Sequence, residues 1–339
     1  MVRRRLLLPL LLLLTAAAPG SSDTIRAPML MRHIAVLASD DYGGRAPGSE
    51  GGRKTEHYIV AQFGAAGLQP GAPAGNWFQR VETGGPGIVD RVAAAVSGTA
   101  DADHADNIIG KVAGSDPSKG AVLITAHWDH LGYCRTLAAD RICNGAIDNA
   151  SGVALLIEIA RAVAAGPRPV RDVYFVATTG EEEGELGAKA FVAQPPVPLA
   201  TIVAAFNLDT MAIAPAGTPV AIIGRGLTDL DPLIFAVARA QHRAVDKDNA
   251  ANRYLDRQDG WPLLRHHVPA VMVGSAFSNI PLLEAFLQGR YHTPADDLAH
   301  PIELGGATED ANLHVALVRA FADPSRFRPK PRNRDARSL

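Results

Sequence analysis

The sequence predicts an α/β fold in which a mostly parallel, mixed central sheet is covered by helices on both faces. Short apolar segments rich in Val, Ile and Ala alternate with longer segments whose apolar residues recur at helical spacing, a pattern typical of such folds. Several of the short segments are followed directly by His, Asp or Glu, as expected where strands end at a site. The chain has 339 residues, of which 47% are hydrophobic, so it has ample material for a core.

The first third of the chain predicts two helices and three strands. Apolar residues at helical spacing predict helices over 23–39 and 51–66, the second ended by Gly67. Between the helices, a loop rich in Gly, Asp and Pro breaks the pattern. Strands are predicted at 78–82 and 91–97, and an edge strand at 107–113.

The rest of the chain predicts alternating strands and helices, which favour a mostly parallel sheet. The predicted strands are continuous apolar runs at 121–126, 172–178, 202–208, 219–223 and 270–274. The predicted helices cover 150–165, 187–193, 229–243 and 309–322.

The two ends of the chain are expected to lie outside this fold. Residues 1–20 combine an arginine-rich start with the apolar run Leu6–Leu14 and small residues after it, which is typical of a secretory signal peptide. The run is too short for a membrane span, so we expect an exported, periplasmic or secreted protein without stable membrane insertion; an uncleaved anchor is the alternative. A single folded domain is expected over 23–322. The basic, proline-rich segment 323–339 is expected to be a disordered tail.

Charge and cysteine content narrow the class of protein further. The net charge of −2 gives no reason to expect a nucleic-acid partner. The only cysteines are Cys134 and Cys143. In an oxidising compartment such a pair can form a disulfide that stiffens the loop around it; two unpaired thiols are the alternative.

Five residues of metal-binding type stand next to the ends of apolar runs, and they are His127, Asp148, Glu182, Asp209 and His292. Each has an ordinary interpretation when taken alone: a structural histidine, a helix N-cap, a solvated acidic turn. Together, two imidazoles and three carboxylates at one edge of a sheet predict a bound cation, because they would be costly to bury without one. This oxygen and nitrogen donor set suits zinc or a similar divalent ion.

The neighbours of these residues have expected roles of their own. Glu181 precedes Glu182 and is free to act as a general base on metal-activated water. Asp129 is the expected hydrogen-bond partner of His127, because metal-bound histidines usually have such a partner. We expect His130 either to contact a metal-binding side chain or to support the loop.

These motifs resemble the co-catalytic dinuclear zinc aminopeptidases, a family that includes bacterial leucyl aminopeptidases, aminopeptidase S and the glutamate carboxypeptidases. The motifs that carry the resemblance are His127-Trp-Asp129, Asp148-Asn-Ala-Ser-Gly152, Glu181-Glu182-x-Gly184, Asn207-Leu-Asp209 and His292-Thr-Pro-Ala-Asp296.

The resemblance implies a zinc-exopeptidase-like fold, a peptide substrate cleaved after its N-terminal residue, and two Zn²⁺ ions per chain. It implies that Asp148 bridges the ions, with His127 and Asp209 completing one site and Glu182 and His292 the other. Glu181 is then the general base that acts on a metal-bridging hydroxide, Asp129 orients His127, and Asp296 supports the loop of His292.

The chain departs from the family around residues 254–261. Only Asp259 of the segment 257–261 matches the family's pattern there, and Tyr254, the residue available to stabilise the oxyanion, stands about one position away from the expected spacing. Three alternatives remain open: a carboxypeptidase or dipeptidase that uses Arg253, Arg257 or Arg290 to hold a carboxylate, a single-zinc glutaminyl cyclase, and a binding module without activity.

Overall fold

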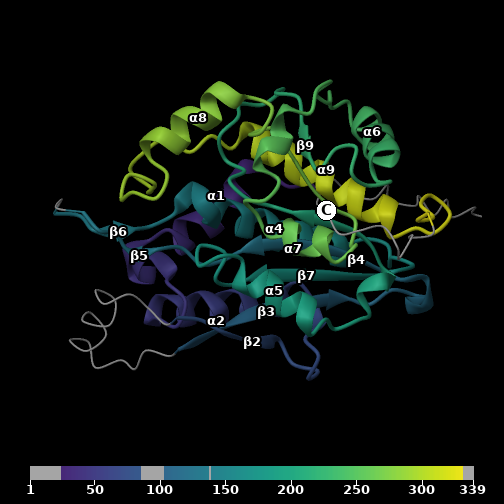
Figure 1. Ribbon diagram of the computed structural model, residues 1–339, viewed down its shortest axis with the longest axis horizontal. Coiled ribbons are helices and arrows are strands. Elements are labelled where there is room, and N and C mark those ends of the chain that lie inside the picture. Colours follow the sequence, from purple (N-terminus) through teal and green to yellow (C-terminus); the bar gives the residue numbers. More distant parts are fainter. Residues whose placement is uncertain (1–23, 85–102, 137–138, 331–339) are drawn as a thin grey trace, which may run out of the picture.

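An eight-stranded mixed sheet forms the centre of the molecule, and helices cover its two faces (Figure 1). The computed structural model of the chain describes residues 24–84, 103–136 and 139–330. The predicted signal peptide and the predicted strand at 91–97 lie outside these residues. Among the helices of the described segments, none is long and apolar enough to cross a membrane.

The strand order is β1-β3-β7-β4-β8-β10-β9, with β2 paired to β3, and β5 and β6 form a separate two-stranded hairpin. The strands of the large sheet are β1 (Gln69–Pro70), β2 (Phe78–Glu82), β3 (His104–Val112), β4 (Ala121–His127), β7 (Asp172–Thr178), β8 (Ile202–Asn207), β9 (Ala221–Ile223) and β10 (Ala270–Gly274). The hairpin strands are β5 (Gly132–Tyr133) and β6 (Ile142–Cys143).

Four neighbouring strands, β7, β4, β8 and β10, run parallel, whereas β3 and β9 run antiparallel to them at either side. Every residue of β4 and β7 is buried, as expected for strands covered on both faces. The parallel strands end together at one edge of the sheet, which brings the segments that follow them into contact.

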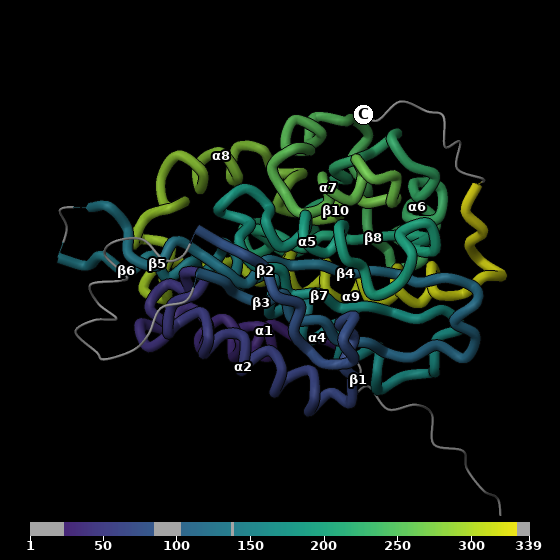
Figure 2. Tube along the Cα trace, turned by 60° about the horizontal axis from the view of Figure 1, so that its bottom comes forward, coloured from purple at the N-terminus to yellow at the C-terminus, as the bar shows by residue number. Residues whose placement is uncertain are grey.

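The helices divide into two layers. One face of the sheet carries α1, α2, α4, α6 and α9, whose apolar side chains share one core with the sheet, and the other face carries α5 and α7. Figure 2 shows α1 and α2 below the sheet and α7 above it. The helices are α1 (Ala27–Leu37), α2 (Glu50–Ala65), α4 (Gly152–Ala165), α5 (Leu186–Ala193), α6 (Asp231–Ala240), α7 (Gly260–Arg265), α8 (Ile280–Gly289) and α9 (Gly305–Phe321).

The most buried helix, α4, follows the segment that contains Asp148. Nearly all of its residues are buried because it packs on β4 on one side and against α1 and α9 on the other. An almost wholly apolar helix is stable in water only in such a place. This packing fixes the N-terminal end of α4 at the edge where the parallel strands end.

The structure differs from the sequence-based prediction in three places. The predicted edge strand 107–113 is the inner strand β3, which pairs with β7 on one side and with β1 and β2 on the other. The helices α7 and α8 were not predicted. The folded body also extends past 322, because Phe327 packs against Phe321 in the core; the predicted disorder of 323–330 is therefore wrong, and 331–339 lie outside the described residues.

Glu56 on α2 has a pH-dependent effect on stability. Burial raises the pKa of its carboxyl group from 4.5 to about 7, although its Oε1 accepts a hydrogen bond from the Asp106 N–H at 2.9 Å. The folded chain therefore binds this proton more tightly than the unfolded chain, and the stability contribution of Glu56 falls as pH rises from 4.5 towards 7. We expect Glu56→Gln to increase the free energy of unfolding by about 1–3 kcal/mol at about pH 8 and to change it little at about pH 4. Urea denaturation at the two pH values tests this, and an equal effect at both would contradict it.

Candidate metal centre

The five predicted metal-binding residues come from five segments that meet at the carboxyl edge of the parallel strands. His127 is the last residue of β4, Glu182 lies in the turn after β7, and Asp209 follows β8. Asp148 lies in the short helical turn that precedes α4, and His292 follows α8. The topology of the sheet thus brings together residues that are far apart in the sequence.

One group of potential ligands consists of His127, Asp148 and Asp209. The Nε2 atom of His127 lies 3.3 Å from Oδ1 of Asp148 and 3.5 Å from Oδ1 of Asp209. Two ligands of a four-coordinate zinc ion, each about 2.0–2.1 Å from the ion, lie about 3.3–3.4 Å apart. These separations therefore suit a shared ion.

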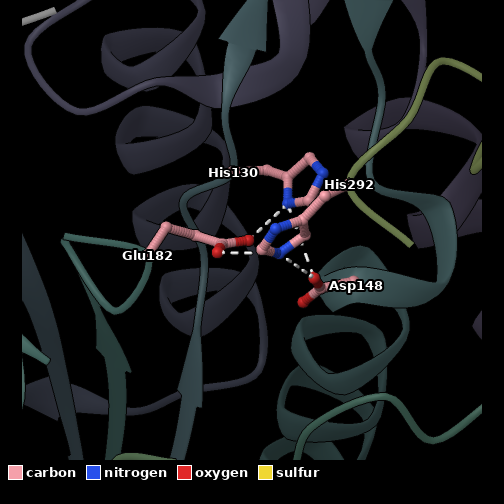
Figure 3. Close-up of side chains that lie close together, drawn as sticks. All are labelled: His130, Asp148, Glu182 and His292. Carbon is pink, nitrogen blue, oxygen red and sulfur yellow. Dashed lines mark hydrogen bonds and ion pairs between the residues drawn. The ribbon is translucent and has the colours of Figure 1, made fainter. Parts of the chain in front are cut away.

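The second group consists of His130, Asp148, Glu182 and His292 (Figure 3). His292 Nε2 lies 3.3 Å from Oδ2 of Asp148 and 2.9 Å from Oε2 of Glu182. Asp148 faces His127 with Oδ1 and His292 with Oδ2. One carboxylate thus joins the two groups.

The atoms that face these two sites lack other partners. His127 Nε2, Asp148 Oδ2 and His292 Nε2 are buried and have no hydrogen-bond partner among the described residues. Unpaired buried polar atoms are costly, and a cation would satisfy all three. The donor set of imidazole nitrogens and carboxylate oxygens fits zinc.

The electrostatics of the cluster favour positive charge. Burial disfavours ionisation of Asp148, but the imidazoles of His127 and His292 outweigh it and hold the pKa of Asp148 well below its usual value. Burial also disfavours the charged form of His127, yet the neighbouring carboxylates raise the pKa of His127 well above its usual value. The carboxylates of the cluster are therefore stable in their ionised form only when positive charge lies beside them.

Glu181 lies outside both groups of potential ligands. Burial raises the pKa of its carboxyl group well above the usual value, and the nearby carboxylates of Asp209, Asp259 and Glu182 raise it further, against the opposing effect of His127. A carboxylate with a raised pKa beside a metal site is a suitable proton acceptor.

Asp129 holds the turn that carries the two glutamates. Its carboxylate accepts hydrogen bonds from the backbone N–H groups of Glu181 and Glu182, at 3.3 and 3.4 Å. It lies 3.7 Å from His127 Nδ1, but the closer partner of that nitrogen is the backbone oxygen of Asp129, at 3.2 Å. His127 is thus oriented mainly by the backbone of Asp129, and the carboxylate positions the glutamate turn.

The turn that carries Asp148 is held from two sides. The carboxylate of Asp296 accepts hydrogen bonds from the N–H groups of Ile147 and Asp148 at 3.0 Å. Asp296 therefore supports the turn that carries Asp148, whereas the sequence predicted support for the loop of His292. The helix-cap alternative for Asp148 is wrong, because Asn149 is the residue that accepts from the Gly152 N–H.

A disulfide joins Cys134 to Cys143, as the sequence predicts. It links the ends of the β5–β6 hairpin, which lies between His127 and Asp148 in the sequence. Cys134 Sγ also lies 3.5 Å from the backbone oxygen of His292. The bond thus restrains the segment between two of the potential ligands.

A pocket opens beside Asp209. It is lined by apolar side chains and by a few polar ones, namely Asp209, Thr210, Ile223, Tyr254, Arg257, Gln258, Met272, Phe277, Leu283, Leu287 and Tyr291. Tyr254 therefore lies on the same pocket as a potential metal ligand, and its ring contacts Phe277 at a centroid distance of 6.3 Å.

Tyr291 and the raised pKa of Asp259 were not predicted from the sequence. The Tyr291 ring stacks on His292 at a centroid distance of 3.6 Å, a contact that adjacency in the sequence alone does not predict. Burial raises the pKa of Asp259 to about 7, and the Thr178 hydroxyl donates to it. Asp259 is thus a buried carboxyl group beside the cluster. The other residues of the segment 257–261 do not match the family's pattern.

The sequence profile of peptidase family M28 matches residues 107–318, well over half of the chain. The chain belongs to peptidase family M28. This confirms the predicted family resemblance. A probable zinc metalloprotease of Pyricularia oryzae is 34% identical over 115 residues, which are 34% of this chain and 22% of that protein. The chain thus spans less than a quarter of the length of that relative.

Solved structures share the fold at low sequence identity. An aminopeptidase from Aneurinibacillus sp. strain AM-1 superposes with a TM-score of 0.63 at 17% identity, covering 91% of this chain and 97% of that one. A glutaminyl cyclase from Porphyromonas gingivalis superposes with a TM-score of 0.59 at 18% identity, covering 87% and 98%. These similarities confirm the predicted α/β fold.

Proposed function

We propose that the protein is a dinuclear zinc aminopeptidase, which removes N-terminal residues from peptides. The observation that carries the proposal is the position of Asp148, whose two oxygens face two separate groups of ligands. In the first group it is joined by His127 and Asp209, and in the second by Glu182 and His292. A single ion would leave one of these groups unsatisfied.

The charge of the site supports two ions. Two divalent cations carry four positive charges, and the carboxylates of Asp148, Glu182 and Asp209 supply three negative charges. This near balance lowers the cost of burying the carboxylates so close together.

The chain's own residues divide the proposed work. When bound, zinc ions lower the pKa of water and polarise the peptide carbonyl group. Glu181 accepts the proton from the attacking water and returns it to the departing amine. Asp129 holds the backbone of Glu181 and so fixes the base relative to His127. Tyr254 lies on the wall of the pocket, and its hydroxyl is the proposed donor to the developing oxyanion.

The pocket beside Asp209 supports an apolar side chain at the cleaved residue. Ile223, Met272, Phe277 and Leu283 line it, and such walls favour apolar groups. The carboxylates of the site would attract the positively charged amino group of a substrate. This favours cleavage next to a free N-terminus over cleavage of an internal peptide bond.

A metal count and a substrate panel test this function. Purified protein loaded with zinc and freed of excess ion is expected to hold two zinc ions per chain by plasma emission analysis. Aminoacyl anilides with free amino groups are expected to be cleaved, and the same compounds with acetylated amino groups are not. Turnover of the blocked compounds at a similar rate would contradict the assignment as an aminopeptidase.

A carboxypeptidase or dipeptidase is the second candidate, and Arg257 is the observation that favours it. Arg253 pairs with Glu284 and Arg290 lies near Asp296, whereas Arg257 lines the pocket and has no ion pair within the described segments. A guanidinium there could bind a substrate carboxylate. Cleavage of N-blocked peptides with a free C-terminus would favour this candidate, and cyclisation of N-terminal glutamine would favour a glutaminyl cyclase.

We also propose that the chain is exported to the periplasm or secreted. The support is the signal-peptide pattern of residues 1–20 together with the disulfide, because structural disulfides persist in oxidising compartments. Fractionation of producing cells, followed by N-terminal sequencing of the protein, tests this. A protein that stays in the cytoplasm with Met1 intact would contradict it.

A further inference from the structure

His130 lies in the second group of the metal centre, although its neighbours already supply three potential ligands there. The side chain is fully buried. Its Nδ1 atom lies 2.7 Å from Oε1 of Glu182, and its ring meets the ring of His292 edge-on at a centroid distance of 5.5 Å. Figure 3 shows the two imidazoles on the same side of Glu182.

The two imidazoles share Glu182 between them. His292 approaches Oε2 of Glu182 at 2.9 Å and also lies 3.3 Å from Asp148. His130 approaches the other oxygen, Oε1, and stays 3.8 Å from Asp148. His130 Nδ1 thus makes one close contact, at 2.7 Å, which is the length of a hydrogen bond from an N–H group to a carboxylate, whereas His292 Nε2 lies close to both Asp148 and Glu182. The contacts of His130 are therefore those of a hydrogen-bond donor.

The backbone around His130 holds the ring in this position. Gly145 has a φ of +58°, and a Cβ atom there would lie 2.7 Å from Cγ and Cδ2 of His130, so the backbone packs directly against the ring. The guanidinium of the buried Arg45 donates to the backbone oxygens of Gly145 at 3.0 Å and Trp128 at 2.9 Å. The His130 N–H donates to the backbone oxygen of Arg45 at 3.3 Å. These contacts connect the segments on either side of the ring.

We propose that His130 is a positioning residue for the second zinc ion: it holds Oε1 of Glu182 so that Oε2 faces the ion between Asp148 and His292. This rests on the proposed dinuclear function. Hydrogen bonds to a metal-binding carboxylate fix which of its oxygens is free to bind, and their loss typically weakens metal binding by about 10- to 100-fold.

Two half-site backgrounds separate this role from a general effect on folding. His127→Ala keeps the ligands of the second ion, and His292→Ala keeps those of the first. His130→Leu, which fills the space but cannot donate, is added to each background, and zinc affinity is measured by competition with a chromophoric chelator. We expect about 10- to 100-fold weaker binding in the His127→Ala background and less than about 3-fold change in the His292→Ala background.

Two further variants act as controls. His130→Asn places an amide N–H near the position of Nδ1 and is expected to recover most of the affinity. His266→Leu changes an exposed histidine outside the site and is expected to leave affinity unchanged. Unchanged affinity for His130→Leu, or an equal loss in the two backgrounds, would overturn the proposal. A wild-type chain that binds fewer than two zinc ions would instead contradict the proposed function.

Discussion

Replacing Glu181 with glutamine is expected to lower kcat by about 10²- to 10⁴-fold while the two proposed zinc ions remain bound. Glutamine has nearly the same shape as glutamate, but it cannot accept a proton at neutral pH. Glu181 lies outside the two groups of potential ligands, so its loss removes the base and leaves the ligands in place. Steady-state kinetics on an aminoacyl anilide, combined with metal analysis of the same preparation, measure both effects.

Glu183 provides a matched control for Glu181. It belongs to the same acidic turn but is exposed, so Glu183→Gln is expected to change kcat by less than about 3-fold, since a solvated carboxylate contributes little. A Glu181→Gln variant that keeps more than about a tenth of the wild-type kcat would contradict its role as the base. Loss of zinc from that variant would show instead that Glu181 is a ligand.

Replacing Asp148 with asparagine is expected to abolish detectable turnover and to remove at least one zinc ion per chain. Asp148 lies within 3.3 Å of His127 and of His292, and an amide side chain offers one weak oxygen ligand in place of two charged ones. Such a ligand would not bridge the two proposed zinc ions, so the losses of metal and of activity are expected together. Zinc content and the increase in melting temperature on zinc addition measure the effect.

An exposed aspartate serves as the control for Asp148→Asn. Asp41 is exposed near the start of the fold, and Asp41→Asn makes the same chemical change without touching the ligands. It is expected to keep two zinc ions and full activity. If Asp148→Asn also kept two ions, the idea that this carboxylate joins the two sites would be wrong.

Continuous apolar segments made the parallel part of the sheet predictable. Residues 172–178 and 270–274 are predicted as strands, and β7 and β10 have these bounds. Such strands are buried on both faces, so their composition alone distinguishes them from loops. Strand β3 was harder to place. The strand predicted at 78–82 is β2, but the sequence does not show that β2 pairs with β3, and it gives no sign of the two-residue strand β1 on the same side.

The gathering of His127, Asp148, Glu182, Asp209 and His292 was predictable because each stands beside an apolar run. The contacts that orient them were not. His130 reaches Glu182, and Asp296 reaches Asp148, only through three-dimensional folding. The same limit applies to Phe327, whose burial depends on Phe321 in α9.

The cystine between β5 and β6 has a consequence for metal selectivity. Free thiolates bind zinc strongly, and Cys134 lies beside the backbone of His292. Oxidation converts both sulfur atoms into poor donors and so removes two soft competitors from the neighbourhood of the proposed zinc sites. Protein folded under reducing conditions would keep the two free thiols as competing zinc ligands. The disulfide therefore favours coordination by nitrogen and oxygen atoms alone.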